Sequence, residues 1–143
     1  MAYRNVLVKS TPQGPIKKEW LMDATIQPGM LVEYASGTRI QMNTATLDPT
    51  LRVAVEDFET PIDGTYASGD LIPFVVPQSG DEIMLWATST AAATISVTNP
   101  VFAVTGGFVH LGTAIAGTPG VAVALETVVL VANTPARILC EVL

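Results

Sequence analysis

Apolar residues alternate with other residues along much of the chain, in the two-residue period of half-buried strands. The segment 51–56 shows this most clearly, because Leu51, Val53 and Val55 fall on one side of the predicted strand. Glycine and proline turn signals separate such segments at intervals of roughly 8–12 residues. Strands are therefore predicted at 30–34, 39–42, 51–56, 71–76, 81–86, 101–104, 108–111, 121–131 and 137–143. This pattern predicts an all-β fold, a compact sandwich or small barrel.

Local features refine this prediction. Pro73 has no amide hydrogen and favours an edge strand or a bulge at its position. The pair Gly106-Gly107 supplies the positive φ angles of a tight turn between two strands. The last two predicted strands are expected to pair with each other across the turn 133–135. The only helical candidate in the body is the alanine-rich stretch 88–93.

The first 22 residues differ from the rest of the chain. Residues 1–22 are predicted to form an extended arm, and residues 23–143 a single β domain. The strand signal in the arm is weak, and the stretch 10–15 interrupts it with two prolines and a glycine. The segment 17–22 fits either one helical turn or an edge strand.

The composition indicates a surface that is partly covered by other protein. Of the 143 residues 49 % are hydrophobic and only 14 % are charged, whereas globular proteins use about 25 % charged residues. With a mean hydropathy of +0.43, the chain is expected to assemble. The uncharged stretch between Glu82 and Glu126 is interrupted by polar residues and glycines, so it predicts no membrane span. The N-terminus has no apolar signal segment, so we expect a soluble protein made in the cytosol.

Charge is distributed unevenly along the chain. Residues 1–39 carry five basic and three acidic residues, a net charge of +2. Residues 40–143 carry two basic and ten acidic residues, a net charge of −8, and the whole chain carries −6. An acidic body is poorly suited to nucleic acid. The mildly basic leading segment suits an arm on a negatively charged surface, although its extra lysines are equally explained as solvated residues.

Residues that carry enzyme chemistry are sparse. His110 is the only histidine and is expected to be a solvent-facing or hydrogen-bonded strand residue. Cys140, the only cysteine, has apolar neighbours and is predicted to be a core thiol in the last strand. The chain has no nucleotide-binding fingerprint and no nucleophile elbow. We therefore expect a non-catalytic protein with no cofactor and no metal.

Carboxylates are the remaining candidates for chemistry. Five of them fall within the segment 56–70, namely Glu56, Asp57, Glu59, Asp63 and Asp70. Such an acidic loop fits a Ca²⁺ site or an acid/base pair, and it also fits a solvated surface loop. Its spacing differs from that of an EF-hand loop. Cation binding by this loop stays open on the sequence alone.

One enzyme family, the deoxyuridine triphosphatases, also consists of small all-β proteins, which form trimers. The run Ile62-Asp63-Gly64-Thr65-Tyr66 resembles the start of that family's substrate-pocket strand, but Gly69 comes one residue late. The family's arginine-serine-serine motif and its glycine-rich phenylalanine tail are missing. Without those groups nothing would hold the triphosphate or its Mg²⁺, so this alternative ranks last.

A series of short motifs points to another family. In order they are Val53–Asp57, Asp63–Asp70, Phe74–Ile83, Thr105–Gly107, Val121–Glu126 and Ala136–Ile138. An acidic strand end, a Tyr-x-x-Gly-Asp loop, an apolar strand and a Pro-x-x-Gly-Asp turn come first, and a glycine-rich hairpin follows. This order resembles the capsid decoration (cement) proteins of tailed bacteriophages. The resemblance covers roughly residues 26–143.

The resemblance implies a β-tulip, a compact β domain with an N-terminal arm. It implies a trimer on the outer capsid surface of the virion, made in the host cytoplasm, that bridges coat subunits and stabilises the head. Its partners are then the major capsid protein and copies of itself, with no nucleic acid and no membrane. The residues expected to contact the capsid are Tyr3, Arg4, Val6, Val8, Lys17, Lys18 and Trp20, unless the arm is a dispensable tail. Asp70 and Asp81 match turn positions of the family and are expected to form turns.

Two other non-enzymatic functions are alternatives to this one. A tail or fibre adhesion module that binds a host glycan would favour exposed aromatic residues on one face. Only Trp20 and Trp86 could serve, and Trp86 lies in an apolar strand. A major shell subunit is disfavoured, because the chain is short and lacks a long helix.

Overall fold

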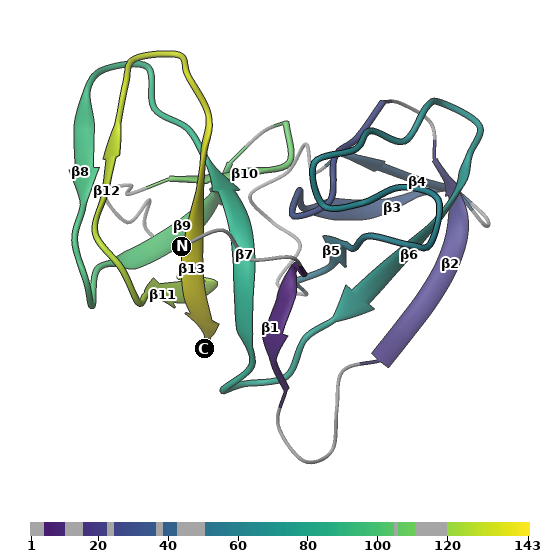
Figure 1. The fold of residues 1–143 in the computed structure, drawn as a ribbon, viewed down its shortest axis with the longest axis horizontal. Helices are drawn as coiled ribbons and strands as arrows, with labels where there is room; N and C mark the ends of the chain where they lie inside the picture. Colours follow the sequence, from purple (N-terminus) through teal and green to yellow (C-terminus); the bar gives the residue numbers. More distant parts are fainter. Residues whose placement is uncertain are drawn as a thin grey trace.

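A computed structural model describes residues 5–10, 16–22, 25–36, 39–42, 51–104, 106–110 and 120–143. The described residues form strands, turns and loops, with no helix among them (Figure 1). The all-β prediction is therefore confirmed, and the helix considered at 88–93 is wrong. Those residues form a loop that leads into a short strand, because local alanine propensity yields to pairing with a distant strand.

Five strands form a closed barrel. In order around it they are β7 (Glu82–Ala87), β10 (Phe108–His110), β9 (Pro100–Val104), β11 (Ala122–Ala124) and β13 (Ala136–Val142). The ring closes because β13 also pairs with β7, from Ala136 opposite Ala87 to Glu141 opposite Glu82. A further strand, β1 (Leu7–Lys9), pairs with β7 outside the ring. Closure leaves the barrel strands without free edges.

A second sheet of five strands lies beside the barrel (Figure 1). Its order is β3 (Val32–Ser36), β4 (Arg39–Met42), β2 (Ile16–Met22), β6 (Leu71–Val76) and β5 (Val53–Ala54). An isolated bridge between Leu31 and Val53 links the two ends of this sheet. The amide of Val32 donates to the carbonyl of Arg52 at 3.0 Å across the same junction.

Two short strands form a separate ribbon, β8 (Ala93–Ile95) and β12 (Val128–Leu130). The ribbon occupies the margin of the molecule that is remote from the second sheet (Figure 1). Ile95 and Leu130 are fully buried and belong to the main core cluster, so the inner face of the ribbon packs on the protein. The expected pairing of 121–131 with 137–143 is thus half right, because β11 pairs with β13 but β12 pairs with β8.

The hydrophobic core has two parts. The larger cluster contains Ile83 and Ile138 of the barrel and also Val53 and Val75 of the second sheet. A smaller cluster lies against the second sheet and includes Ile26, Val32, Ala54, Tyr66, Ile72 and Phe74. Because side chains of both sheets meet in the larger cluster, the barrel and the second sheet share a core within 143 residues.

A tight turn at Gln27–Met30 joins the two sheets. The amide of Gly29 donates to Ala54 in the second sheet at 2.8 Å, and its carbonyl accepts from the Trp86 amide in the barrel at 3.3 Å. The Trp86 ring nitrogen also donates to the carbonyl of Pro28 at 3.0 Å. Gly29 has a φ of +95°, and a Cβ there would lie 3.0 Å from the Met84 carbonyl, so this turn requires glycine.

Pro73 was expected at an edge or a bulge, and the structure places it elsewhere. It lies inside β6, opposite Glu19 of β2, with β5 on the other side of the strand. Its carbonyl accepts from the amide of Val55 at 3.1 Å, just beyond the end of β5. Since backbone N–H and C=O of one strand residue point the same way, the missing N–H faces a position where β5 has already ended. The strand predicted at 51–56 shortens to two residues for the same reason.

The described residues of the predicted arm are strands that pair within this chain. β1 pairs with β7, and the Val6 carbonyl accepts from the Met84 amide at 2.8 Å. β2 pairs with β6 over six residue pairs, from Ile16 opposite Val76 to Leu21 opposite Leu71, and with β4 at its end. The segment expected to be a helical turn or an edge strand is therefore an internal strand. The boundary at residue 22 stays a prediction.

Candidate functional site

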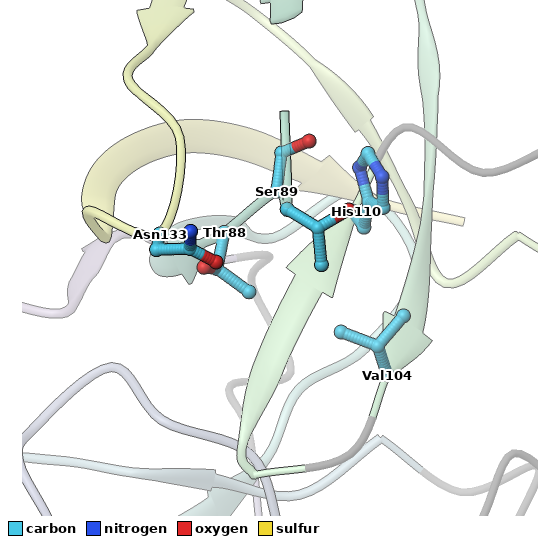
Figure 2. A pocket seen from close by; sticks show the side chains of 6 residues that line it. Thr88, Ser89, Val104, His110 and Asn133 are labelled. Carbon is cyan, nitrogen blue, oxygen red and sulfur yellow. The ribbon is translucent and has the colours of Figure 1, made fainter. Parts of the chain in front are cut away.

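A pocket opens at one end of the barrel, with a volume of about 310 Å³. Its lining residues are Thr88, Ser89, Thr90, Val104, His110 and Asn133. They come from the loop after β7, the ends of β9 and β10 and the turn before β13. In the view of Figure 2, Thr88 and Asn133 lie to one side, with His110 and Val104 to the other.

Backbone hydrogen bonds hold the loop that lines this pocket. The Thr88 amide donates to the Val109 carbonyl at 3.1 Å, and the Asn133 amide donates to the Ser89 carbonyl at 2.8 Å. The buried Ser89 hydroxyl accepts from the Ala91 amide at 3.3 Å. The pocket therefore has fixed walls that carry hydroxyl, amide and imidazole groups and no charged residue.

His110 is neither fully exposed nor fully hydrogen-bonded, which corrects the sequence-based expectation. Its side chain is half-buried, and its Nδ1 atom is buried without a hydrogen-bond partner among the described residues. Among the described residues, Nδ1 therefore forms no hydrogen bond with the hydroxyl of Ser89 or Thr88. His110 lies opposite Phe102 in the β9–β10 hairpin. The loop 88–90 lines the same pocket, and sequence periodicity does not reveal that this distant loop lies beside the ring.

Cys140 behaves as predicted. It is fully buried in β13 within the main core cluster. Burial, and then the nearby charge of Glu126, raises the pKa of the thiol to about 12. A thiol of this kind is a poor nucleophile near neutral pH.

Three carboxylates of the acidic loop are hydrogen-bonded or ion-paired within the chain, one in its own loop and two with distant segments. Glu56 accepts from the Val6 amide at 3.0 Å, and Asp57 accepts from the amides of Glu59 at 2.9 Å and Thr60 at 2.6 Å. Asp63 forms an ion pair with Arg137 at 2.6 Å. In the part of the chain that the structure describes, no three His, Cys, Asp or Glu residues gather as a group that could hold a metal ion.

Asp70 and Asp81 form turns, as predicted. The Asp70 carboxylate accepts from the Ala67 amide at 2.8 Å, and the Asp81 carboxylate accepts from the Gln78 amide at 2.7 Å. In each turn the aspartate amide donates back to the first residue's carbonyl, and the preceding glycine has a φ of about +90°. The turn Ser96–Asn99 repeats this arrangement, with Asn99 in place of aspartate.

The residues compared with the deoxyuridine triphosphatases lie in the core and its junctions. Tyr66 is almost fully buried, and its hydroxyl donates to the Val55 carbonyl at 2.8 Å. Burial and the charges of Asp57 and Glu56 raise the pKa of this hydroxyl far above its ordinary value. Ile62 is buried as well. The tyrosine ring is thus part of the smaller core cluster rather than the wall of an open pocket.

Arg137 links the acidic loop to the barrel. Its guanidinium lies over the Trp86 ring with 4.5 Å between Cζ and the ring centroid. The same group donates to Asp63 and to the Ile62 carbonyl. Trp86, one of two aromatic candidates for glycan binding, is therefore covered by Arg137 and held by Pro28.

The predicted capsid-contact residues have different positions. Val6 is fully buried in the main core cluster, so its side chain lies in the interior and we remove it from the contact surface. Val8 is half-buried in β1. The backbones of Lys17, Lys18 and Trp20 lie in β2, while Tyr3 and Arg4 lie outside the described residues. Capsid contact stays a prediction for these residues.

No helix in the described part of the chain is long and apolar enough to cross a membrane. No family model matches the chain, and no curated protein matches it in sequence. Among solved structures, the chain is similar to the head fiber gp8.5 N base in bacteriophage phi29, with a TM-score of 0.54 and 12 % sequence identity. The match covers 90 % of this chain and 94 % of that chain. At this identity the likeness shows a shared fold over nearly the whole of both chains.

Proposed function

We propose that this chain is a non-enzymatic structural protein of a phage head. It binds the outer surface of the assembled head as a trimer, bridges coat subunits and stabilises the shell as a decoration or cement protein. The observation that carries the proposal is the fold shared with a phage head-fibre base over 90 % of the chain. The motif order from Val53 to Ile138 supports it independently, because that resemblance rests on sequence and leads to the same class of virion protein.

The attachment that we propose relies on many weak contacts. Three linked copies raise the effective concentration of each further contact once the first has formed, so the trimer binds more tightly than one subunit. A protein that binds the assembled lattice and not its free subunits stabilises the lattice by mass action. The contact residues in this proposal are Tyr3, Arg4, Val8, Lys17, Lys18 and Trp20.

Co-sedimentation with phage heads that lack this protein tests the proposal. The purified chain is expected to pellet with the heads and to raise the temperature at which they release their DNA. Lys17→Gln with Lys18→Gln is expected to weaken binding, while Thr65→Glu with Ser79→Glu changes the net charge equally at exposed sites elsewhere. A wild-type chain that stays in the supernatant at all concentrations would overturn the function. Equal binding of both variants would remove only Lys17 and Lys18 from the proposed contact residues and would leave the proposed function in place.

The base of a head fibre is a second candidate, which the fold match itself favours. Such a base attaches to the head and carries a further fibre, so its attachment has no need to stabilise the shell. The heat-release measurement separates the two functions, because only the cement function requires a higher release temperature. Incubation with deoxyuridine triphosphate and Mg²⁺ tests the non-enzymatic part, and release of pyrophosphate would contradict it.

A further inference from the structure

The ribbon of β8 and β12 has an outer face with large exposed apolar residues. Val129 on β12 and Val131 just after this strand are 70 % and 63 % exposed. Thr94 lies opposite Val129 in the register and is also exposed. The opposite face of the ribbon is buried through Ile95 and Leu130. One face therefore belongs to the core, and the other presents β-branched residues to the outside.

This outer face carries no charge. Eight residues of 90–100 and seven of 127–135 are exposed, and none of these fifteen is Asp, Glu, Lys or Arg. The exposed charged residues of the described chain lie in other segments, such as Lys9, Asp57 and Glu141. The uncharged surface is therefore concentrated on the ribbon and the loops at its two ends, at one margin of the molecule (Figure 1).

The strand edges of the ribbon are also open. Within the described residues, β8 and β12 pair only with each other, so each has one edge without a strand partner. Soluble monomers commonly protect such edges with lysine or another charged residue, with proline inside the strand or with a bulge. Neither strand has any of these, since β8 is Ala-Thr-Ile and β12 is Val-Val-Leu. This combination is typical of a surface that another protein covers.

We propose that the ribbon face is the surface through which copies of this chain associate. The chain carries a net charge of −6, so two copies repel each other except where an uncharged face of one meets an uncharged face of the other. A standard interface uses roughly 20–30 residues on each side, and the fifteen exposed residues supply at least half of that number. When the ribbon of every copy faces a common rotation axis, the contact buries the three exposed valines Val97, Val129 and Val131.

Light scattering after size-exclusion chromatography tests this surface. The wild type is expected to elute at a multiple of 15.0 kDa, and Val129→Lys is expected to lower the molar mass to that of one chain. Thr94→Lys places the same charge opposite Val129 and provides a second test if the first variant folds poorly. Leu71→Lys is the matched control, because Leu71 is 55 % exposed on the second sheet. Circular dichroism establishes that each variant is folded.

The proposal is overturned if the wild type is a monomer at concentrations that saturate heads, or if folded Val129→Lys and Thr94→Lys keep the wild-type mass. The ribbon proposal rests on the proposed function only for the expectation that three copies associate. Head binding measured in parallel separates the two proposals. Wild-type oligomers that dissociate in Val129→Lys but ignore heads would contradict the function alone, whereas head binding by oligomers that neither variant disrupts would contradict the ribbon surface alone.

Discussion

Replacement of Arg137 by methionine is expected to lower the free energy of unfolding by about 2–5 kcal/mol. Methionine keeps an apolar stem against Trp86 but removes the guanidinium. The charged hydrogen bond to the Ile62 carbonyl contributes about 1.5–3 kcal/mol, and the cation over the Trp86 ring about 0.5–1 kcal/mol. The Asp63 ion pair adds at most about 1 kcal/mol, because the Asp63 side chain is 84 % exposed and water screens the pair.

Urea unfolding followed by circular dichroism measures this difference at a fixed protein concentration, since oligomers make stability depend on concentration. Asp63→Asn is the matched variant, because it removes only the ion pair. It is expected to cost less than about 1 kcal/mol, and addition of 1 M NaCl is expected to reduce that cost further. The two variants therefore separate the buried contacts of Arg137 from its exposed one.

Two results would refute this assignment. If Asp63→Asn destabilises the fold as much as Arg137→Met, the exposed ion pair is the main link between the acidic loop and the barrel. The small contribution assigned to this pair because Asp63 is exposed is then wrong. If Arg137→Met costs less than about 0.5 kcal/mol, the guanidinium does not link the acidic loop to the barrel in solution. An unchanged slope of free energy against urea is required in both variants, because a changed slope indicates altered unfolded or native states.

Two further predictions concern backbone strain and proton linkage. Gly69→Ala is expected to lower the free energy of unfolding by about 1 kcal/mol, because its φ is +90° but the space around it is open. Gly107→Ala is expected to lower it by more than about 2 kcal/mol, since its Cβ would also lie 3.1 Å from the Leu31 carbonyl. Urea midpoints that rank the two variants in reverse would contradict this. Alkaline conditions are expected to destabilise the fold from pH 9 upward by about 1.4 kcal/mol per pH unit. The cause is that the Cys140 thiol loses its proton near its ordinary pKa of 9.0 in the unfolded chain, but near a pKa of about 12 in the folded chain. Tyr66 adds to the loss of stability above pH 10. Stability is thus complete below pH 9, and Cys140→Ala is expected to abolish the loss between pH 9 and 10; a wild-type profile that stays flat to pH 11 would contradict the burial of both groups.

Features of the fold set by neighbouring residues could be predicted from the sequence. The turns ending at Asp70 and Asp81 are examples, because the glycine, the aspartate and the amide that it accepts from lie within four residues. The burial of Cys140 follows from the apolar strand around it. The pairing of β2 with β6 and β4 was not predictable, because the segment 17–22 has no apolar alternation and its partners lie far along the chain.

The pocket was beyond sequence reasoning for a related reason. His110 gains its surroundings from the loop 88–90 and from Asn133, both of which belong to other strand connections. The junction at Trp86 likewise depends on Arg137 and Pro28, which lie 51 residues after it and 58 residues before it in the chain. Nothing local in either segment predicts these contacts. By contrast, the uncharged character of the ribbon was visible in the sequence, but its exposure was not.

The position of β2 changes how attachment to a head must be tested. Deletion of residues 1–22 would remove β1 from its pairing with β7 and β2 from between β4 and β6, together with the backbone pairing from Ile16 to Leu21. Loss of head binding after such a deletion would then report unfolding of the second sheet as readily as loss of a contact. Lys17→Gln with Lys18→Gln leaves the backbone of β2 unchanged, so weaker binding by this variant, at unchanged stability, isolates the contribution of the two charges. The distinction matters because a strand that belongs to a sheet contacts a capsid only through the face that the sheet leaves open.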